Sequence, residues 1–335
     1  MNVSSLNRIR IRILGSRRRR RDIACVVAHL AHTADTADTV NAPGGNVSRI
    51  STLDGAVAVI TGAASGIGRG MARAFAAQGA SVVCSDIDAD GAQATADELA
   101  STGVETLAMA CDVADRSQVD ALAAEAWARF GRVDVVCANA GIAPAVRGPV
   151  IDLEEDDIRT VVEVNLMGAW RTCAVFGRRL VEQDTPSHII VTGSENSLGV
   201  PAPMMGFYTI GKHGLLGMTD LMRQELPDHV GVSIVMPGIV ATNLTPALSV
   251  DDDEAEPTWG LNANTMGRHV VQAMLDGEYH IVAHPPVVEL VTERTAELEA
   301  AFARQAPRRE GDERLDTRHA MATIIAQMRA SADES

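Results

Sequence analysis

The chain has 335 residues, a formal net charge of −15 and 46% hydrophobic residues, with only 3% aromatic residues. The acidic balance argues against nucleic acid and anionic membranes as partners. The chain also contains no run of about eighteen apolar residues, the length needed to span a bilayer. The five cysteines are odd in number, dispersed and mostly inside apolar segments. They are typical of buried thiols in a reducing compartment and show no metal-ligand spacing. Composition therefore predicts an acidic, cytoplasmic, globular protein without a bound metal.

Residues 1–50 differ from the rest of the chain, because eight arginines stand within residues 8–21. Such a start is typical of an organellar presequence or a nucleic-acid-binding arm, whereas the apolar patch at 23–30 is too short and interrupted for a secretory signal. We favour a third interpretation, a disordered extension upstream of the true start. Since no methionine lies between Met1 and the first expected strand, that start would be non-ATG, near Val47.

Between residues 53 and 283, short apolar runs alternate with segments of helical periodicity. Strands are expected at 56–61, 81–86, 105–112, 133–138, 188–192 and 231–236. Helices are expected at 66–79, 89–101, 116–130, 156–184, 208–225 and 265–275. Continuous apolar strands alternating with helices indicate a parallel sheet that is covered on both faces. The predicted fold is a Rossmann-type, doubly wound α/β sheet in three αβα layers, within a single domain.

The C-terminal third is less regular. Residues 242–264 contain an acidic run and are expected to form a variable substrate loop or lid. An edge strand at 279–283 and a closing helix at 287–304 complete a catalytic domain that we place at 51–305. Residues 306–335 are predicted to be a charged tail with at most one loose helix.

A glycine-rich turn directly joins the first strand to the first helix, and its key residues are Gly62, Ser65, Gly66, Ile67 and Gly68. Glycines at such a turn allow the backbone to approach a pyrophosphate closely, and the helix N-terminus then stabilises the negative charge. Three glycines in this spacing are a weak signal alone. Their position at the first strand–helix junction of a βαβ unit predicts a dinucleotide-binding site.

Asp86 ends the second strand, about twenty residues beyond the glycine turn. A carboxylate at this point accepts a hydrogen bond from a ribose 2′-hydroxyl and repels a 2′-phosphate. Neither Ser85 nor Ile87 is basic. The sequence therefore favours NAD over NADP, with Arg69 as the residue that could soften this preference.

Tyr208 and Lys212 are four residues apart, so on a helix they lie on one face, one turn from each other. A phenol titrates near pH ~10 in isolation, and a neighbouring ammonium group lowers its pKa toward neutrality. Lys212 is the only lysine in the chain, and Tyr208 is one of two tyrosines. A compact ammonium at this single position indicates a function that a planar guanidinium performs poorly. We interpret the pair as an acid/base centre, although an accidental surface pair stays open on spacing alone.

Further motifs follow the glycine turn in order: Asp112-Val113, Asn139-Ala140-Gly141, Asn165, Tyr208 with Lys212, and Pro237-Gly238 leading to Thr242. With these motifs the chain resembles the short-chain dehydrogenase/reductase family across roughly residues 53–283. The resemblance implies that the tyrosine is the general acid/base and that the lysine binds the nicotinamide ribose and lowers the tyrosine pKa. It also implies that Asn165 holds a water in a proton relay.

The same resemblance implies the cofactor contacts of the remaining motifs. They would be Asp112 and Val113 at the adenine, Asn139, Ala140 and Gly141 beside the adenosine pocket, and Pro237, Gly238 and Thr242 along the nicotinamide.

The catalytic serine is the point at which this sequence departs from the family. The family places a serine about thirteen residues before the tyrosine, and an ungapped count falls on Glu195. An ionised carboxylate cannot donate a hydrogen bond to a carbonyl oxygen. Ser194, with one extra residue in the following loop, is therefore our candidate, and Ser197 is the weaker one. Glu195 is left open as either a surface acid or a polar contact for the substrate.

Two other groups of residues lie close to these motifs in the sequence. Met204, Met205 and Phe207 precede the tyrosine and either line an apolar pocket or pack simply. His280 and His284 lack a third ligand at metal-binding spacing, so we expect a loop that closes near the substrate.

The predicted function is an NAD(H)-dependent oxidoreductase that interconverts a secondary alcohol and a ketone. Alternatives are an epimerase or dehydratase on the same fold, or a non-catalytic NAD-sensing protein. The resemblance further implies a homodimer or homotetramer that packs through the helices containing Asn165 and Tyr208.

Overall fold

The structure is a computed structural model, and it describes residues 50–144, 146–199, 203–242, 244, 255–317, 320 and 323–324. The N-terminal extension up to residue 49 lies outside the described residues, as do residues 243 and 245–254 of the expected substrate loop. The disordered extension and the acidic part of the lid therefore stay predictions.

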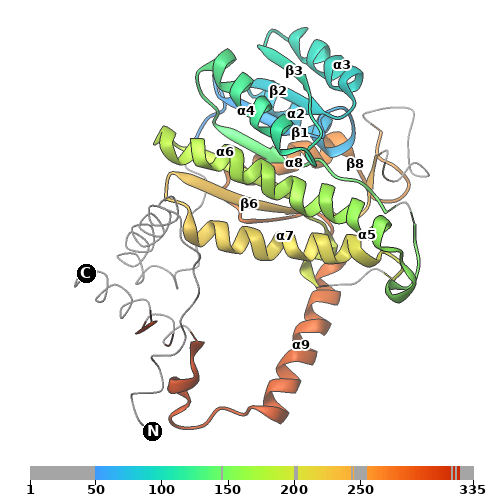
Figure 1. Cartoon of the computed structure of the whole chain (residues 1–335), viewed down its shortest axis with the longest axis vertical. Coiled ribbons are helices and arrows are strands. Elements are labelled where there is room, and N and C mark those ends of the chain that lie inside the picture. The colour runs from blue at the N-terminus through green and yellow to red at the C-terminus, as the bar shows by residue number, and fades with distance from the viewer. Residues whose placement is uncertain are drawn as a thin grey trace, which may run out of the picture. The chain divides into compact units, whose positions relative to one another are not determined.

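The main sheet of the described chain has seven parallel strands in the order β3-β2-β1-β4-β5-β6-β9 (Figure 1). Its strands are β1 (Val57–Thr61), β2 (Ser81–Asp86), β3 (Thr106–Ala110), β4 (Val135–Ala138), β5 (Ser187–Thr192), β6 (Val230–Met236) and β9 (His280–Val282). The chain winds outward from β1 to β3 and then returns to the other side of β1 at β4. In open α/β sheets this reversal leaves a crevice at the carboxyl ends of the strands, where ligands bind.

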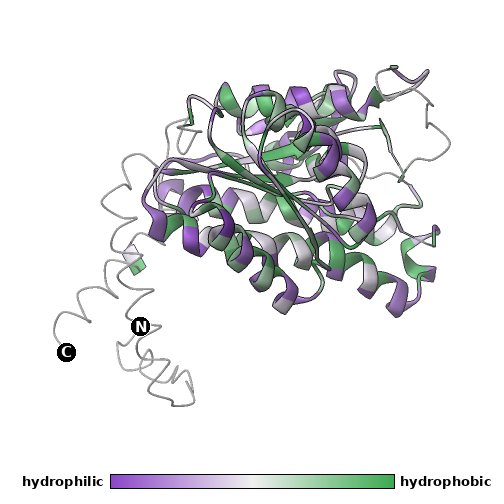
Figure 2. Ribbon diagram, turned by 90° about the horizontal axis from the view of Figure 1, so that it is seen from above, coloured by the Kyte–Doolittle hydropathy of each residue, from purple (hydrophilic) through white to green (hydrophobic). Residues whose placement is uncertain are grey.

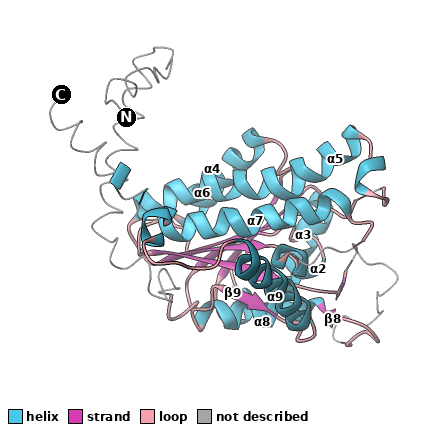
Figure 3. Cartoon of the chain, turned by 90° about the horizontal axis from the view of Figure 1, so that it is seen from below, coloured by secondary structure: helices cyan, strands magenta, loops and turns pink. Residues whose placement is uncertain are grey.

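Helices cover both faces of the sheet. Helices α2 (Gly66–Ala77), α3 (Ala89–Ala100) and α8 (Ala263–Leu275) cover one face, and α4 (Arg116–Phe130), α6 (Ala169–Gln183) and α7 (Gly206–Glu225) cover the other. Figure 3 shows the sheet between α6 and α7 on one side and α8 on the other. The predicted three-layer, Rossmann-type α/β fold is confirmed.

Two hydrophobic cores form because alternate residues of each strand face opposite layers. In β1, Ala58 and Ile60 pack with Phe75 of α2, whereas Val57 and Val59 belong to the core beneath α4 and α6. The central strands are buried along their whole length. They therefore read as continuous apolar runs, and Figure 2 shows them as the hydrophobic centre of the ribbon.

The helix expected at 156–184 forms without a break, but it is not α-helical throughout. It consists of α5 (Glu155–Val162), a π-helix (Glu163–Gly168) and α6. Periodicity did not predict this, because one wide turn changes the direction of a few side chains without ending the helical pattern. The π-helix places Asn165 among the buried residues, and π-turns inside helices are frequent at functional sites.

The C-terminal third is more ordered in places than expected. The described end of the 242–264 segment includes β8 (Leu261–Asn262), which pairs with β7 (Val240–Ala241). The strand expected at 279–283 is β9, at the edge of the sheet. Helix α9 (Val287–Gln305) forms as predicted but has no buried residue, so it does not contribute to the cores.

Three short 3-10 helices complete the described elements: η2 (Val150–Asp152), η4 (Glu195–Leu198) and η6 (Asp312–Leu315). The compact unit that holds the sheet ends at Phe302, and our domain boundary at 305 stays a prediction. None of the helices in the described part of the chain combines the length and the apolar character needed to cross a membrane.

Candidate active site

A cavity of about 320 Å³ lies at the carboxyl ends of the strands. It is lined by nearly all the residues that the sequence singled out: Gly62, Ser65, Gly66, Ile67, Asp86, Asp112, Val113, Asn139, Ala140, Gly141, Ser194, Tyr208, Lys212, Pro237, Gly238 and Thr242. The fold thus brings motifs from across the chain to a single site. Two predicted residues, Gly68 and Asn165, do not line the cavity.

The glycine turn is fixed by backbone conformation. Gly62 and Gly66 have φ angles of +72° and +56°, a region that side-chain-bearing residues rarely adopt. A Cβ atom at Gly68 would lie 1.9 Å from the carbonyl oxygen of Gly62, so only glycine allows α2 to start this close to the turn. Ser65 is the N-cap of α2 but makes no side-chain capping bond. The first amides of the helix are therefore not capped by this side chain, and amides in that position can bind an anion.

Asp86 is held at the end of β2 by backbone donors. The amide of Ala64 donates to its Oδ2 at 3.0 Å, and the amide of Asp88 donates to its Oδ1 at 3.0 Å. These two bonds orient the carboxylate beside the glycine turn, on the wall of the cavity. Each oxygen retains acceptor capacity for a hydroxyl of a bound ligand.

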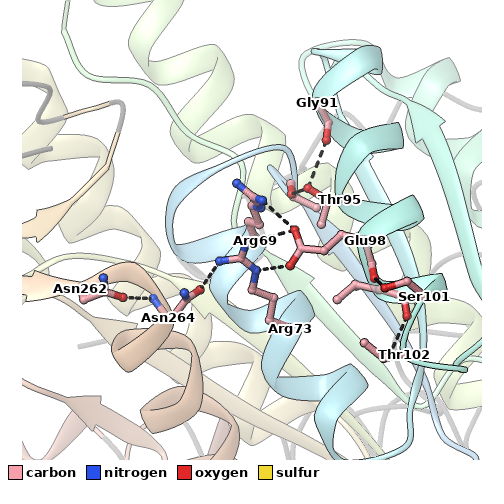
Figure 4. A network of polar contacts seen from close by, with 11 residues as sticks. Arg69, Arg73, Gly91, Thr95, Glu98, Ser101, Thr102, Asn262 and Asn264 are labelled. Carbon is pink, nitrogen blue, oxygen red and sulfur yellow. Dashed lines mark hydrogen bonds and ion pairs between the residues drawn. The ribbon is translucent and has the colours of Figure 1, made fainter. Parts of the chain in front are cut away.

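Arg69 is engaged outside the cavity. Its guanidinium pairs with Glu98 of α3 at 2.7 Å, and Arg73 binds the same carboxylate at 2.5 Å (Figure 4). Burial of Glu98 raises its pKa, but the hydrogen bonds and charges of the two arginines outweigh burial, so the pKa is lowered overall. Arg73 also donates to Asn264 of α8 at 3.0 Å, and this network fastens α2 to α3 and α8.

Asn139 joins the ends of three strands under the cavity. Its Nδ2 donates to the Thr61 carbonyl at 3.0 Å, and its Oδ1 accepts from the Thr192 hydroxyl at 3.0 Å. The Thr61 hydroxyl accepts from the amides of Asn139 and Ala140. Side-chain bonds of this kind hold β1, β4 and β5 together where the sheet opens to the ligand.

Asn165 is tied to the segment after β4. Its Oδ1 accepts from the Ile142 amide at 2.8 Å, and its Nδ2 donates to the Ile142 carbonyl at 2.9 Å. Gly141 lies directly beside it, since a Cβ there would be 3.1 Å from that Oδ1. The side chain is therefore used to position the loop that lines the cavity. A relay water at Asn165 stays a prediction.

The two candidate serines differ in what they contact. The Ser194 hydroxyl lies near enough to Tyr208 to lower the pKa of the phenol, and it caps η4 by accepting from the Asn196 amide at 3.2 Å. The Ser197 hydroxyl instead donates to the Lys212 carbonyl at 2.7 Å and accepts from the Ser194 amide at 3.1 Å. Ser194 is thus the serine that reaches the tyrosine, and Ser197 links η4 to α7.

Tyr208 and Lys212 lie one turn apart on α7, as predicted, with the ammonium 5.7 Å from the centre of the phenol ring. The predicted lowering of the Tyr208 pKa is reversed. Burial raises it most and the charge of Glu195 adds to this, while the hydrogen bond with Ser194 lowers it to a smaller extent. The Lys212 ammonium donates to the Thr192 carbonyl at 2.8 Å, and burial lowers its own pKa to about 8.

Sequence reasoning missed Thr61 and Thr192, which carry much of the hydrogen bonding beneath the cavity. Each is the last residue of its strand. A threonine in this position, next to an expected ligand site, was the available signal. Met205 and Phe207 line a small recess beside Tyr208, together with Leu153 and Ile158, which favours the apolar-pocket interpretation.

Comparison with known proteins shows the family of this chain. The family model described as short chain dehydrogenase matches residues 56–253. A 1-deoxy-11-beta-hydroxypentalenate dehydrogenase from Streptomyces avermitilis is 36% identical over 197 residues, which cover 58% of this chain and 73% of that protein. A D-threitol dehydrogenase from Mycolicibacterium smegmatis is 34% identical over 193 residues, which cover 57% of this chain and 73% of that protein.

Solved structures give the same result. A short-chain dehydrogenase/reductase from Burkholderia phymatum in complex with NAD matches with a TM-score of 0.68 and 29% identity, over 75% of this chain and 97% of that chain. An alcohol dehydrogenase from Thermococcus sibiricus complexed with 5-hydroxy-NADP has a TM-score of 0.61 and 29% identity, over 69% and 96% of the two chains. Since the family model covers more than half of the chain and the fold agrees, this protein belongs to the short-chain dehydrogenase family.

Proposed function

We propose that the protein is an NAD(H)-dependent oxidoreductase that interconverts a secondary alcohol and a ketone. The observation that carries this proposal is that the Ser194 hydroxyl lies near enough to Tyr208 to lower its pKa, at the wall of a cavity that also holds the glycine turn. Two hydroxyl groups in contact can both bind one substrate oxygen. A dinucleotide bound in the same cavity would lie next to that oxygen, which supports a redox reaction at this carbon.

The residues act on the substrate oxygen and its proton, while a bound nicotinamide would exchange the hydride. In the reductive direction, Ser194 donates a hydrogen bond to the carbonyl oxygen and polarises it. Tyr208 then gives its hydroxyl proton to that oxygen as the carbinol forms. A raised pKa keeps Tyr208 protonated and ready to act as this acid. In oxidation the same groups act in reverse.

Lys212 holds a buried positive charge near the tyrosine. The ammonium has three donors, and one is used by the Thr192 carbonyl. The remaining donors can bind ribose hydroxyls of the cofactor, and the positive charge stabilises a phenolate that forms during oxidation. Asn165 supports this arrangement by fixing Gly141 and Ile142 opposite Lys212.

We propose NAD as the cofactor in preference to NADP. Asp86 faces the cavity as an acceptor for a ribose hydroxyl, and its charge repels a 2′-phosphate. Arg69, which could have neutralised that phosphate, is paired with Glu98. One structural relative is in complex with NAD and another with an NADP derivative, so the relatives do not decide between the two cofactors. The choice of NAD therefore depends on Asp86 and Arg69 of this chain.

We also propose that the protein forms a homo-oligomer through α6 and α7, which run side by side in Figures 1 and 3. Large apolar side chains are exposed on these helices: Trp170 at 43%, Ile210 at 50% and Leu221 at 56% of their full surface. Exposed apolar groups gathered on neighbouring helices favour burial against another subunit.

Turnover of the Tyr208→Phe variant tests the proposed chemistry. NADH oxidation is measured with a panel of ketones, and NAD reduction with the matching secondary alcohols. Removal of the phenol hydroxyl should lower kcat by roughly 10²–10⁴-fold, while NADH binding, followed by fluorescence, is retained.

The other tyrosine supplies a matched control. Tyr279 is also buried, but its hydroxyl contacts Asp220 and Thr219 on α7. Tyr279→Phe should therefore keep kcat. Full activity in Tyr208→Phe would overturn the proposed mechanism.

A further inference from the structure

Glu195 stands at the border of the cavity with its backbone fixed. It is the first residue of η4 and follows Ser194 directly. Its amide donates to the Pro237 carbonyl at 2.8 Å, which ties it to the carboxyl end of β6. The Glu195 side chain therefore extends from a fixed segment of backbone. Two residues next to it, Ser194 and Pro237, line the cavity.

The carboxylate of Glu195 packs against Gly238 and His284. A Cβ atom at Gly238 would lie 2.7 Å from Glu195 Oε2 and 2.8 Å from the His284 ring. Glycine at 238 therefore makes the room that the carboxylate occupies. Gly238 itself lines the cavity, so the carboxylate adjoins the cavity wall.

His284 cannot supply a hydrogen bond to this carboxylate. The Gly238 amide donates to His284 Nδ1 at 3.0 Å, so that nitrogen is an acceptor. The other nitrogen, Nε2, lies 2.9 Å from the Ile239 carbonyl and must donate to it. Both ring nitrogens are thus committed to the backbone, and the imidazole is held as its Nε2–H tautomer.

Glu195 is half-buried without a donor among the described residues. Its neighbours in the described chain donate no hydrogen bond to either carboxylate oxygen. Burial raises its pKa. The charge of Glu195 in turn raises the pKa of Tyr208.

We propose that Glu195 is a specificity-determining residue, and this inference rests on the proposed function. Its carboxylate accepts a hydrogen bond from a hydroxyl group on the carbon next to the reacting carbinol. Ser194 and Tyr208 hold the carbinol oxygen, and Glu195, the next residue along the chain, binds the neighbouring hydroxyl. The substrates are accordingly vicinal diols and the matching α-hydroxy ketones.

The charges around the site favour a hydroxyl over other donors. A substrate ammonium would also satisfy Glu195, but it would lie in the same cavity as the Lys212 ammonium and be repelled by it. A substrate carboxylate would be repelled by Glu195 itself. A neutral hydroxyl donates to the carboxylate without either penalty.

The test compares substrates that differ by a single hydroxyl group. The ratio of kcat/KM for butane-2,3-diol to that for butan-2-ol is measured in the wild type, Glu195→Ala and Glu195→Gln, and the ketones 3-hydroxybutan-2-one and butan-2-one are compared in the same way. We expect the wild type to prefer the hydroxylated member at least about tenfold, the worth of one hydrogen bond to a charged group. Glu195→Ala should reduce the ratio to near one, and Glu195→Gln to an intermediate value.

Two controls keep the result interpretable. Glu182 is an exposed carboxylate near the end of α6, which leads to the opposite end of β5, and Glu182→Ala should leave the ratio unchanged. The near-isosteric Glu195→Gln variant provides the comparison if Glu195→Ala does not fold, as judged by thermal unfolding and NADH binding.

The possible outcomes separate this inference from the function on which it rests. A wild type that turns over none of the four substrates overturns the proposed function together with this inference. A wild type that is active, with the same ratio in all the Glu195 variants, overturns the role of Glu195 alone. Preference for 3-aminobutan-2-ol over the diol would overturn the choice of a hydroxyl and assign the carboxylate to an ammonium.

Discussion

The two halves of the cavity are held in shape by different means. On the cofactor side, backbone conformation fixes the site, through the positive φ angles of Gly62 and Gly66 and the absence of room for any side chain at Gly68. On the substrate side, side chains link segments that are distant in the sequence. There Lys212 donates to the Thr192 carbonyl, and Ser197 donates to the Lys212 carbonyl.

The difference determines how each half tolerates change. A turn that depends on local sterics fails when one methyl group is added, but it does not depend on the rest of the molecule. On the hydrogen-bonded substrate side, each substitution removes only the contacts of one side chain. Substitutions there can therefore separate residues that act on the substrate from residues that hold the site together. Substitutions on the two sides should therefore differ in kind, and the largest effect is expected on the cofactor side.

Gly68→Ala should strongly weaken dinucleotide binding. The added Cβ would stand 1.9 Å from the Gly62 carbonyl oxygen, so α2 must move away from the turn, with a loss of stability of roughly 1–3 kcal/mol or more. We expect NADH affinity to fall at least about a hundredfold, since in dinucleotide-binding folds the helix and the turn bind the pyrophosphate together. Titration by NADH fluorescence measures this.

Gly217 provides the matched control for that experiment. It is a helical glycine on α7, and a Cβ there would meet nothing within 4 Å. Gly217→Ala should keep NADH affinity and stabilise the protein by about 0.5–1 kcal/mol. If Gly68→Ala bound NADH as tightly as Gly217→Ala, steric control of the cofactor side would be refuted.

Ser194→Ala and Ser197→Ala should separate reaction from support on the substrate side. Ser194 contacts Tyr208, and its loss should lower kcat by about 10²–10³-fold, as for other donors to a reacting oxygen. Ser197 joins η4 to α7 from a buried position. Its loss should cost about 1–3 kcal/mol of stability and change kcat far less. Steady-state kinetics measures the change in kcat, and urea unfolding measures the change in stability. A larger loss of kcat in Ser197→Ala than in Ser194→Ala would contradict this expectation.

His188 should make the fold sensitive to acid. It is buried in β5, the strand that carries Thr192 at its other end, and its Nε2 lies 2.8 Å from the Ser233 hydroxyl. Burial lowers its pKa to about 3 from the ordinary 6.5. Between these values the unfolded chain binds a proton that the folded protein does not, so the free energy of unfolding decreases as the pH falls through this window.

The size of this effect depends on the His188 pKa. Between pH 7 and pH ~4 the wild type should lose about 3 kcal/mol that His188→Val retains. Urea unfolding of both proteins across that pH range gives the comparison. If the unfolding free energies of the two proteins fell in parallel with pH, His188 would not cause the loss of stability in acid. Strand β5 would then tolerate protonation of His188 better than the burial of this residue implies.

Asp86→Ala should give the smallest effect, a relaxed choice of cofactor. Loss of the acceptor and of the repelling charge should lower the preference for NAD over NADP by about tenfold, the value of one such hydrogen bond. The ratio of kcat/KM for the two cofactors is the measurement. Asp90 is exposed in the first turn of α3, and Asp90→Ala should leave the ratio as it is. Equal ratios in both variants would show that Asp86 does not contact the ribose.

The sequence alone determined the order of strands and helices, the glycine turn and the spacing of Tyr208 and Lys212. These features depend on periodicity and on local backbone sterics, which neighbouring residues specify. It also narrowed the catalytic serine to Ser194 or Ser197, because both stand close to the expected position.

Only the tertiary structure decided which of these groups meet. The contact of Ser194 with Tyr208 requires η4 and α7 to pack together, and the reversed shift of the Tyr208 pKa depends on burial and on the charge of Glu195. The sequence pattern predicted neither the π-helix at Asn165 nor the half-buried position of the Glu195 carboxylate. Hydrogen bonding, desolvation and charge act through distances between segments far apart in the chain, and residue spacing does not contain those distances.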